Sequence, residues 1–184
     1  SKNPPDIIVE GEVEGGETRM LWMYADYTAV PSQIGPMRSA RPPYIKFSEL
    51  FDAIFLHWGQ SQTKRGTNYI GANTIFRQDK VDHINQMTYG GRDSSRGVST
   101  EHTGVLYGAK IADAIKGEKF RTDANESKYT KFNFAKEETT VSDTECNTLG
   151  LTFSSRTATR DWTYNSSDKM YHCNDYKTDV ERKN

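Results

Sequence analysis

Length and composition narrow the kinds of protein that this chain can be. Its 184 residues are enough to bury a hydrophobic core, so we expect one domain, with or without a tail. Only 34% of the residues are hydrophobic, but 11% are aromatic, so the core must depend on Phe, Tyr and Trp, and disorder of the whole chain is not expected. The net charge of −1 gives no electrostatic reason to expect binding to nucleic acid or to an anionic membrane.

Charge is distributed unevenly along the chain. Acidic side chains gather within residues 10–17, whereas the stretch 38–96 is rich in arginine and lysine. A cationic surface on this stretch would suit an anionic small molecule better than a long duplex.

Cysteines and sequons favour an exported protein. The two cysteines are Cys146 and Cys173, and sequons begin at Asn125 and Asn165. This pattern fits a secreted glycoprotein with one disulfide, which would stabilise the fold by about 2–4 kcal/mol. Two unpaired thiols and chance sequons are the alternative. No apolar run is long enough to span a membrane and no signal peptide is present, so an exported protein would be the processed form.

The first third of the chain is predicted to contain an arm, a strand and a helix. Residues 1–18 combine prolines, paired glycines and acidic side chains, which is typical of a flexible arm or an edge strand. The aromatic-rich segment 19–28 favours a buried strand. Apolar residues then recur at helical spacing as far as Trp58, which predicts a helix with Ser48 as its N-cap and Gly59 as its end.

The rest of the chain is predicted to hold helices first and strands later. A polar, glycine-rich loop is expected over 59–76. Helices are expected over 79–87 and over 101–116, the second ended by Gly117, with a glycine-rich loop over 89–97 between them. Alternating patterns favour strands over 129–134 and 149–153. We therefore predict an α+β fold in a single domain, with mixed or antiparallel sheets and a few helices in the first two thirds.

Three segments follow from these patterns. We expect a flexible acidic arm over 1–18, a globular α+β domain over 19–153, and a polar C-terminal segment over 154–184 that the disulfide could close.

Complete catalytic motifs are missing from the sequence. The four histidines have no metal-binding spacing, the two cysteines form no Cys/His cluster, and no GxSxG elbow, P-loop or GxGxxG run occurs. No metal is therefore expected. An isolated histidine in a helix, such as His57 or His83, is more often a packed residue than a catalyst.

An ordered series of short motifs remains, and it resembles one family. "RSARPP" begins at Arg38, "VST" ends at Thr100, and the acidic "SDTE" follows further along the chain. This order resembles the ADP-ribosyltransferase domains of the cholera-toxin and pertussis-toxin type. In that family an arginine, a Ser-Thr-Ser strand and a Glu/Gln-x-Glu pair form the NAD site. The resemblance covers residues 37–153.

The resemblance implies a role for each matching residue. Arg38 stands for the NAD-binding arginine, whose guanidinium can bond two phosphate oxygens at once. Ser99 and Thr100 stand for the first two positions of the Ser-Thr-Ser strand. Glu145 stands for the catalytic glutamate, which stabilises the oxocarbenium-like transition state as nicotinamide leaves. Asp143 stands where the family has Glu or Gln, and its shorter side chain leaves the acceptor open.

Each assignment has an ordinary structural alternative. Trp58 could stack on nicotinamide or belong to the core. Arg38 could pair with a surface carboxylate, and Ser99 or Thr100 could cap a helix. The two acidic residues of the "SDTE" stretch could be solvated loop residues.

Two main functions are therefore predicted. The resemblance implies a secreted NAD-dependent ADP-ribosyltransferase or NAD glycohydrolase, acting as a toxin or effector on a protein or small-molecule acceptor, with NAD as substrate. The alternative is a non-enzymatic secreted or surface binding module, such as an adhesion, coat or effector domain, because aromatic residues are abundant and no catalytic motif is complete. Whether the protein is an enzyme stays open. Single-stranded nucleic-acid binding through the basic stretch and its aromatics is a third, less favoured reading.

Overall fold

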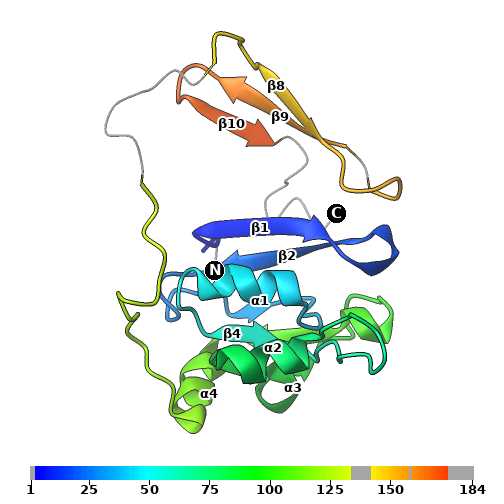
Figure 1. The fold of residues 1–184 in the computed structure, drawn as a ribbon, viewed down its shortest axis with the longest axis vertical. Coiled ribbons are helices and arrows are strands. Elements are labelled where there is room, and N and C mark those ends of the chain that lie inside the picture. The colour runs from blue at the N-terminus through cyan, green and yellow to red at the C-terminus, as the bar shows by residue number, and fades with distance from the viewer. Residues whose placement is uncertain (1–2, 134–141, 158, 174–184) are drawn as a thin grey trace. The chain divides into compact units, whose positions relative to one another are not determined.

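The chain has an α+β fold, as the sequence predicts. The computed structural model describes residues 3–133, 142–157 and 159–173. Small sheets and short helices alternate along the first two thirds, and only strands follow among the described residues of the last third (Figure 1). The helices of the described residues are α1 (Pro42–Glu49), α2 (Ala72–Asp79), α3 (Gln86–Tyr89) and α4 (Ile111–Glu118), with 3₁₀ turns η1 (Glu14–Gly16), η2 (Thr100–His102) and η3 (Gly108–Lys110). The strands are β1 (Ile7–Glu12), β2 (Thr18–Met23), β3 (Gln33–Ile34), β4 (Phe55–His57), β5 (His83–Asn85), β6 (Gly91–Arg92), β7 (Gly104–Tyr107), β8 (Thr148–Leu151), β9 (Arg160–Asn165) and β10 (Met170–Cys173).

The contacts divide the chain into two compact units, which we describe separately. Unit 1 consists of residues 3–7 and 23–132, and unit 2 of residues 8–22 and 133–184. Unit 1 holds the four helices and the sheets β3-β7-β6 and β4-β5, while unit 2 holds the sheet β10-β9-β8 and most of the β1-β2 pair. The division into an arm (1–18), a globular domain (19–153) and a C-terminal segment (154–184) stays a prediction.

A short extended segment connects the two sheets of unit 1. Within residues 37–40, the amide of Met37 donates to the carbonyl of Gly104 in β7 over 2.7 Å. On the other side, the amide of Ala40 donates to the carbonyl of Gly59, just after β4, over 2.9 Å. Because both edges of this segment are hydrogen-bonded, it fixes the carboxyl end of β4 against β7.

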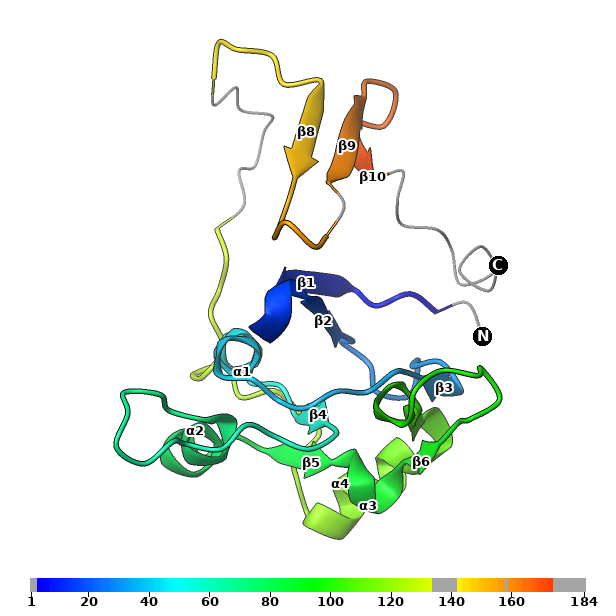
Figure 2. The ribbon, with the colours of Figure 1, turned by 90° about the vertical axis from the view of Figure 1, so that its right-hand side faces the viewer.

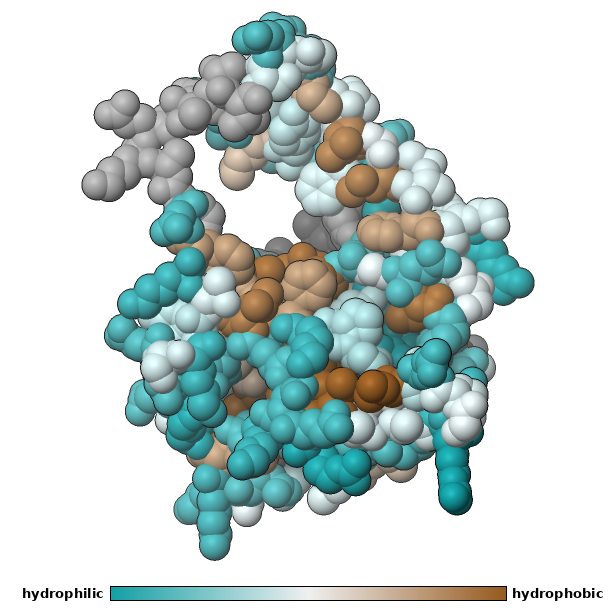
Figure 3. Space-filling model, viewed as in Figure 1, coloured by the Kyte–Doolittle hydropathy of each residue, from teal (hydrophilic) through white to brown (hydrophobic). Residues whose placement is uncertain are grey.

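Helices cover the paired strands β4 and β5 from two sides. Phe76 of α2 lies against Phe55 of β4 with a centroid distance of 5.7 Å. Ile84 of β5 instead belongs to a buried cluster with Ile111 and Ile115 of α4. Figure 2 shows α2 and α4 on opposite sides of these strands. The outer face of α2 is exposed, and hydrophilic side chains cover it (Figure 3).

The first helix begins earlier than the sequence predicts. α1 starts at Pro42, directly after the arginine-rich turn, because proline has a suitable φ for the first helical turn and needs no hydrogen-bond acceptor there. Ser48, the predicted N-cap, is buried inside α1, and its hydroxyl donates to the carbonyl of Ile45 over 2.7 Å. The predicted helix from Ser48 to Trp58 is therefore wrong, since Phe55–His57 forms strand β4.

Two more predicted helices contain buried strands. Residues 79–87 form β5 and the start of α3, and residues 101–116 begin with η2 and β7 before α4. The last helix passes through Gly117 and ends where Lys119 adopts a left-handed conformation. Short apolar runs of this kind do not distinguish a buried strand from a buried helix, which explains these errors.

The strand predictions are more accurate. The segment 19–28 contains most of β2, and 149–153 contains most of β8. β1 forms within 1–18, which agrees with the edge-strand alternative. The predicted strand 129–134 is not formed over its described residues, and residue 134 lies outside them. The predicted loop after Gly59 contains α2.

The cysteines of unit 2 are unpaired thiols. Cys173 in β10 lies opposite Trp162, which lies opposite Leu149 in β8. Cys146 precedes Leu149 by three residues, so the two cysteines are separated by two strand spacings and by about 10 Å along the strands. A disulfide requires Cα atoms within about 7 Å, so this register does not allow the expected bond.

Two neutral histidines of unit 1 bond to each other, His57 buried and His83 partly buried. His57 is 1% exposed, and its Nε2 lies 3.0 Å from Nδ1 of His83, while its own Nδ1 lies 2.7 Å from the carbonyl oxygen of Gly59. Because a carbonyl only accepts, His57 carries its proton on Nδ1 and accepts from His83 through Nε2. Both rings stack on Phe76. Burial lowers the pKa of His57 from 6.5 to about 4, and burial also lowers the pKa of His83.

This pair predicts a loss of stability in mild acid. Unfolded His57 takes up a proton near pH 6.5, and folded His57 does so only near pH 4. Stability is therefore complete above pH 6.5 and falls as the pH falls toward 4, by about 3 kcal/mol for a shift of this size. Urea denaturation between pH 7.5 and pH 4.5 should show this decrease. His57→Gln should flatten the profile, and an equally steep profile in that variant would contradict the assignment.

Candidate functional site

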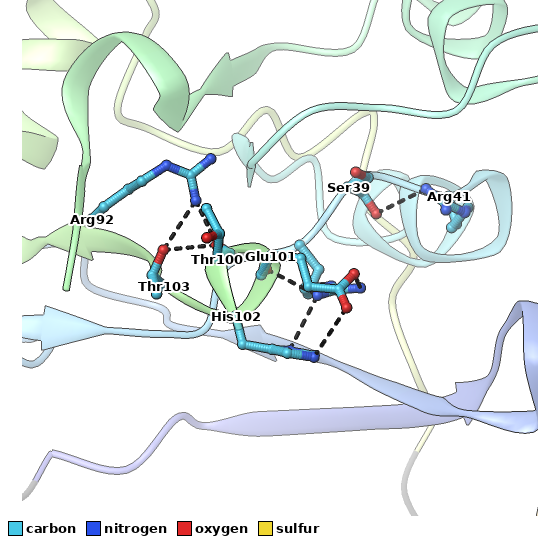
Figure 4. Close-up of polar contacts among 8 residues, drawn as sticks. Ser39, Arg41, Arg92, Thr100, Glu101, His102 and Thr103 are labelled. Atoms are coloured by element: carbon cyan, nitrogen blue, oxygen red, sulfur yellow. Dashed lines mark hydrogen bonds and ion pairs between the residues drawn. The ribbon is translucent and has the colours of Figure 1, made fainter. Parts of the chain in front are cut away.

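Two arginines from distant parts of unit 1 hold the exposed 3₁₀ turn η2. We call the following residues the arginine cluster: Arg38, Arg92, Thr100, Glu101, His102 and Thr103. In Figure 4, Arg92 and Thr103 lie on one side of the turn, Glu101 and His102 lie on the other, and Ser39 and Arg41 lie apart from Arg92. The arginines meet here because β6 is paired with β7 and residues 37–40 are bonded to β7 from the other side.

Arg38 is engaged by the turn itself. Its Nη1 donates to the carbonyl of Glu101 over 2.9 Å and lies 3.1 Å from Nδ1 of His102, and its Nη2 pairs with the Glu101 carboxylate over 3.3 Å. Since a guanidinium only donates, Nδ1 of His102 must accept, and the imidazole proton is on Nε2. The structure thus gives Arg38 the carboxylate partner that the sequence offered as the alternative to NAD binding.

Arg92 is held by neutral groups only. Its Nη1 donates to the carbonyl of Thr100 over 2.6 Å and to Oγ1 of Thr103 over 3.0 Å. Its Cζ lies 5.1 Å from the centre of the Trp58 ring, which is a cation–π distance. The structure shows no ion pair for Arg92 among the residues it describes.

Two glycines make room for Trp58. A Cβ on Gly104 would lie 3.0 Å from Cδ2 of the indole, and one on Gly90 would lie 3.2 Å from Cζ3. The main chain of Trp58 is fixed as well, since its amide donates to the carbonyl of Arg38 over 3.0 Å. Trp58 is therefore a half-buried, packed platform under Arg92, and its stacking on a ligand stays a prediction.

The remaining predicted site residues do not converge within one unit. Ser99 precedes η2 without a capping hydrogen bond from its side chain, and Thr100 belongs to the turn. Asp143 and Glu145 are exposed residues of unit 2, whereas Arg38 and Ser99 belong to unit 1. Neither unit by itself contains all the residues of the predicted NAD site, and NAD as substrate stays a prediction.

Sequence reasoning missed Arg92 and Thr103. Arg92 lies in the glycine-rich run "YGGRDSSRG", where only its membership of the basic stretch was noticed. The pattern Gly90-Gly91-Arg92 is the one available signal, because glycines beside a strand allow the backbone or a large ring to come close.

Two kinds of feature, a cluster of metal-ligand side chains and a membrane-spanning helix, are absent from the described residues. Within them, no group of three or more His, Cys, Asp and Glu side chains could hold a metal ion. No described helix has both the length and the apolar character that a bilayer crossing needs.

A buried side-chain amide follows strand β5. Gln86 follows β5 as Trp58 follows its parallel partner β4, and the Gln86 carbonyl and the indole both approach Gly90. The Gln86 side chain is fully buried, and neither its Nε2 nor its Oε1 has a hydrogen-bond partner among the described residues. Such a group costs desolvation energy that nothing offsets.

Gln86→Met should therefore stabilise the protein. Methionine has a similar length and no polar group to desolvate, so we expect the free energy of unfolding to rise by about 1 kcal/mol. Urea denaturation of the purified protein measures it. Gln78→Met on the exposed face of α2 is the matched control and should change stability by less than about 0.5 kcal/mol. A loss of stability in Gln86→Met would contradict the absence of a partner.

The two halves of the Arg38 contact should differ in strength. Glu101→Ala removes an ion pair whose carboxylate side chain is 66% exposed, so stability should change by less than about 0.5 kcal/mol. Arg38→Ala also removes the donor to the Glu101 carbonyl and should cost about 1 kcal/mol. Denaturant titration of both variants and of the double variant separates the contribution of the ion pair from that of the hydrogen bond to the carbonyl. Equal losses would mean that the ion pair alone matters.

Comparison with known proteins gives a different family from the one that the sequence motifs suggested. A family model described as "Protein of unknown function (DUF3048) N-terminal domain" matches residues 3–121. A Bacillus subtilis (strain 168) protein named "Putative lipoprotein YerB" is 30% identical over 125 residues, which is 65% of this chain and 34% of that protein. The chain thus spans about a third of the length of this relative. No solved structure matches.

The resemblance to ADP-ribosyltransferase toxins is therefore wrong. The "RSARPP" and "VST" runs lie inside the residues 3–121 that match another family, and "SDTE" lies outside them. In the fold, "RSARPP" leads into α1 and "VST" leads into η2. Because the family match covers well over half of the sequence, the chain belongs to the DUF3048 family and contains its N-terminal domain.

Proposed function

We propose that this protein is a non-enzymatic, extracytoplasmic binding module whose ligand contacts the arginine cluster of unit 1. The single observation that carries the proposal is the state of Arg92, an exposed guanidinium that is held by three neighbours and neutralised by none among the described residues. A charge fixed in this way is suited to a ligand that brings the opposite charge.

The contacts of the other polar groups support binding rather than catalysis. His57 and His83 bond to each other in the core, and His102 accepts from Arg38 on the surface. Among the described contacts, none of these histidines is within hydrogen-bonding distance of a serine, threonine or cysteine side chain, which a nucleophile and its base would need.

The location is inferred from the relative. The Bacillus subtilis protein is named a lipoprotein, and we extend an extracytoplasmic location from it to this chain. The sequons fit this location: Asn125 is exposed, and Asn165 lies at the end of β9 with its Oδ1 bonded to the amide of Ser167 over 2.9 Å. Glycosylation stays a prediction.

Co-sedimentation with cell-envelope material tests the proposal. Purified chain should bind protease-treated Bacillus subtilis envelope polymer saturably, and the bound fraction should decrease severalfold as salt rises from about 0.05 to 0.5 M, because exposed charges are screened. Incubation with NAD should release no nicotinamide above the background. Nicotinamide release, or envelope binding that is absent or does not saturate, would contradict the proposal.

A further inference from the structure

We propose that the ligand of unit 1 carries an oxyanion, a carboxylate or a phosphate group, and that this group binds the outer edge of the Arg92 guanidinium. The inference rests on the proposed binding function and names the chemistry of its ligand.

The inner edge of the guanidinium is already used. Nη1 of Arg92 donates to Thr100 and to Thr103, and Cζ lies over the Trp58 ring, 5.1 Å from its centre. The structure shows no acceptor among the described residues for Nε and Nη2. These two nitrogens form one edge with two parallel N–H groups, which matches the two oxygens of a carboxylate or a phosphate.

Arg92 is also oriented before any ligand arrives. Thr103 is 4% exposed, and its hydroxyl donates to the Thr100 carbonyl over 2.7 Å, so both acceptors of Arg92 belong to one rigid turn. The Trp58 ring already packs against the backbone of Gly104 in β7, in the space that a side chain would otherwise occupy, so it cannot move closer to β7. A fixed guanidinium loses little conformational entropy on binding.

The acid that follows Arg92 in sequence, Asp93, and the acid of the arginine cluster, Glu101, have other partners. Asp93 follows Arg92 in sequence, but one of its oxygens accepts from Gln33 over 2.8 Å and the other from Ser95 over 2.5 Å. The Ser95 hydroxyl is the main reason that the pKa of Asp93 lies below its usual range, so this carboxylate is well satisfied without Arg92. Glu101 pairs with Arg38. Within the described part of the chain neither acid neutralises Arg92, so an external anion can reach its guanidinium.

Carboxylate and phosphate ligands share this chemistry, and the experiment separates them. The 184-residue protein is titrated with poly-L-glutamate, with poly(glycerol phosphate) and with neutral dextran, at low and moderate salt. The readouts are calorimetry and the NMR signal of the Arg92 Nε–H group. We expect one or both anionic polymers to bind and to shift this signal, and dextran to do neither. The polymer that binds more tightly identifies the group.

Matched variants connect binding to the site. Arg92→Gln should weaken binding at least tenfold, whereas Arg77→Gln, which removes an equal charge from the exposed end of α2, should change it less than twofold. Arg92→Lys keeps the charge without the paired donors and should also weaken binding severalfold, which keeps the test informative if Arg92→Gln unfolds.

Several results would overturn the inference. Equal effects of the Arg92→Gln and Arg77→Gln changes would show general charge attraction, and wild-type protein that binds neither anionic polymer would remove the oxyanion. If envelope binding is retained in Arg92→Gln, the proposed binding function stands and its assignment to Arg92 fails. If wild-type protein binds no envelope material, the proposed function itself fails.

Discussion

Unit 1 depends on the hydrogen bonds along both edges of residues 37–40. On one edge Met37 is bonded to β7, and on the other Arg38 and Ala40 are bonded to the residues that follow β4. Without this segment the small sheets β4-β5 and β3-β7-β6 would be separate pairs and triplets of very short strands, which are marginal on their own. The fold therefore gains its continuity from a stretch that is itself barely a strand.

The same segment determines where the arginine cluster forms. The amide of Trp58 donates to the carbonyl of Arg38, so the backbone places Arg38 beside the tryptophan that supports Arg92. Gly104 of β7 then leaves space for the indole, and the indole supports Arg92 from β6. Each residue of this series positions the next one, which is why an exposed guanidinium can have a defined direction.

Buried polar side chains of unit 1 differ in whether they have hydrogen-bond partners among the described residues. His57 and His83 satisfy each other, and His57 also satisfies the carbonyl of Gly59, a residue with a φ of 75° that L side chains rarely adopt. The side chain of Gln86 lacks any such partner among the described residues. The histidine pair thus holds the backbone at Gly59 only while both rings are neutral. The buried amide of Gln86 carries a desolvation cost that no partner among the described residues offsets.

The sequence by itself determined the fold class, the strands β2 and β8, and the basic character of the stretch that includes both arginines. These features depend on local composition and on period-two patterns, which a single chain displays directly. It also determined that two prolines follow Arg41, although the helix that they begin was placed six residues too late.

Tertiary structure alone decided which apolar runs are strands and which of the two arginines has no counter-ion among the residues that the structure describes. β4, β5 and β7 have three or four residues each, which is too short for a sequence pattern to identify a strand, and only pairing with neighbours makes them strands. Arg38 and Arg92 look alike in sequence. Arg38 has a carboxylate within reach and Arg92 has a tryptophan and two neutral oxygens, because residues far apart in the chain meet around η2.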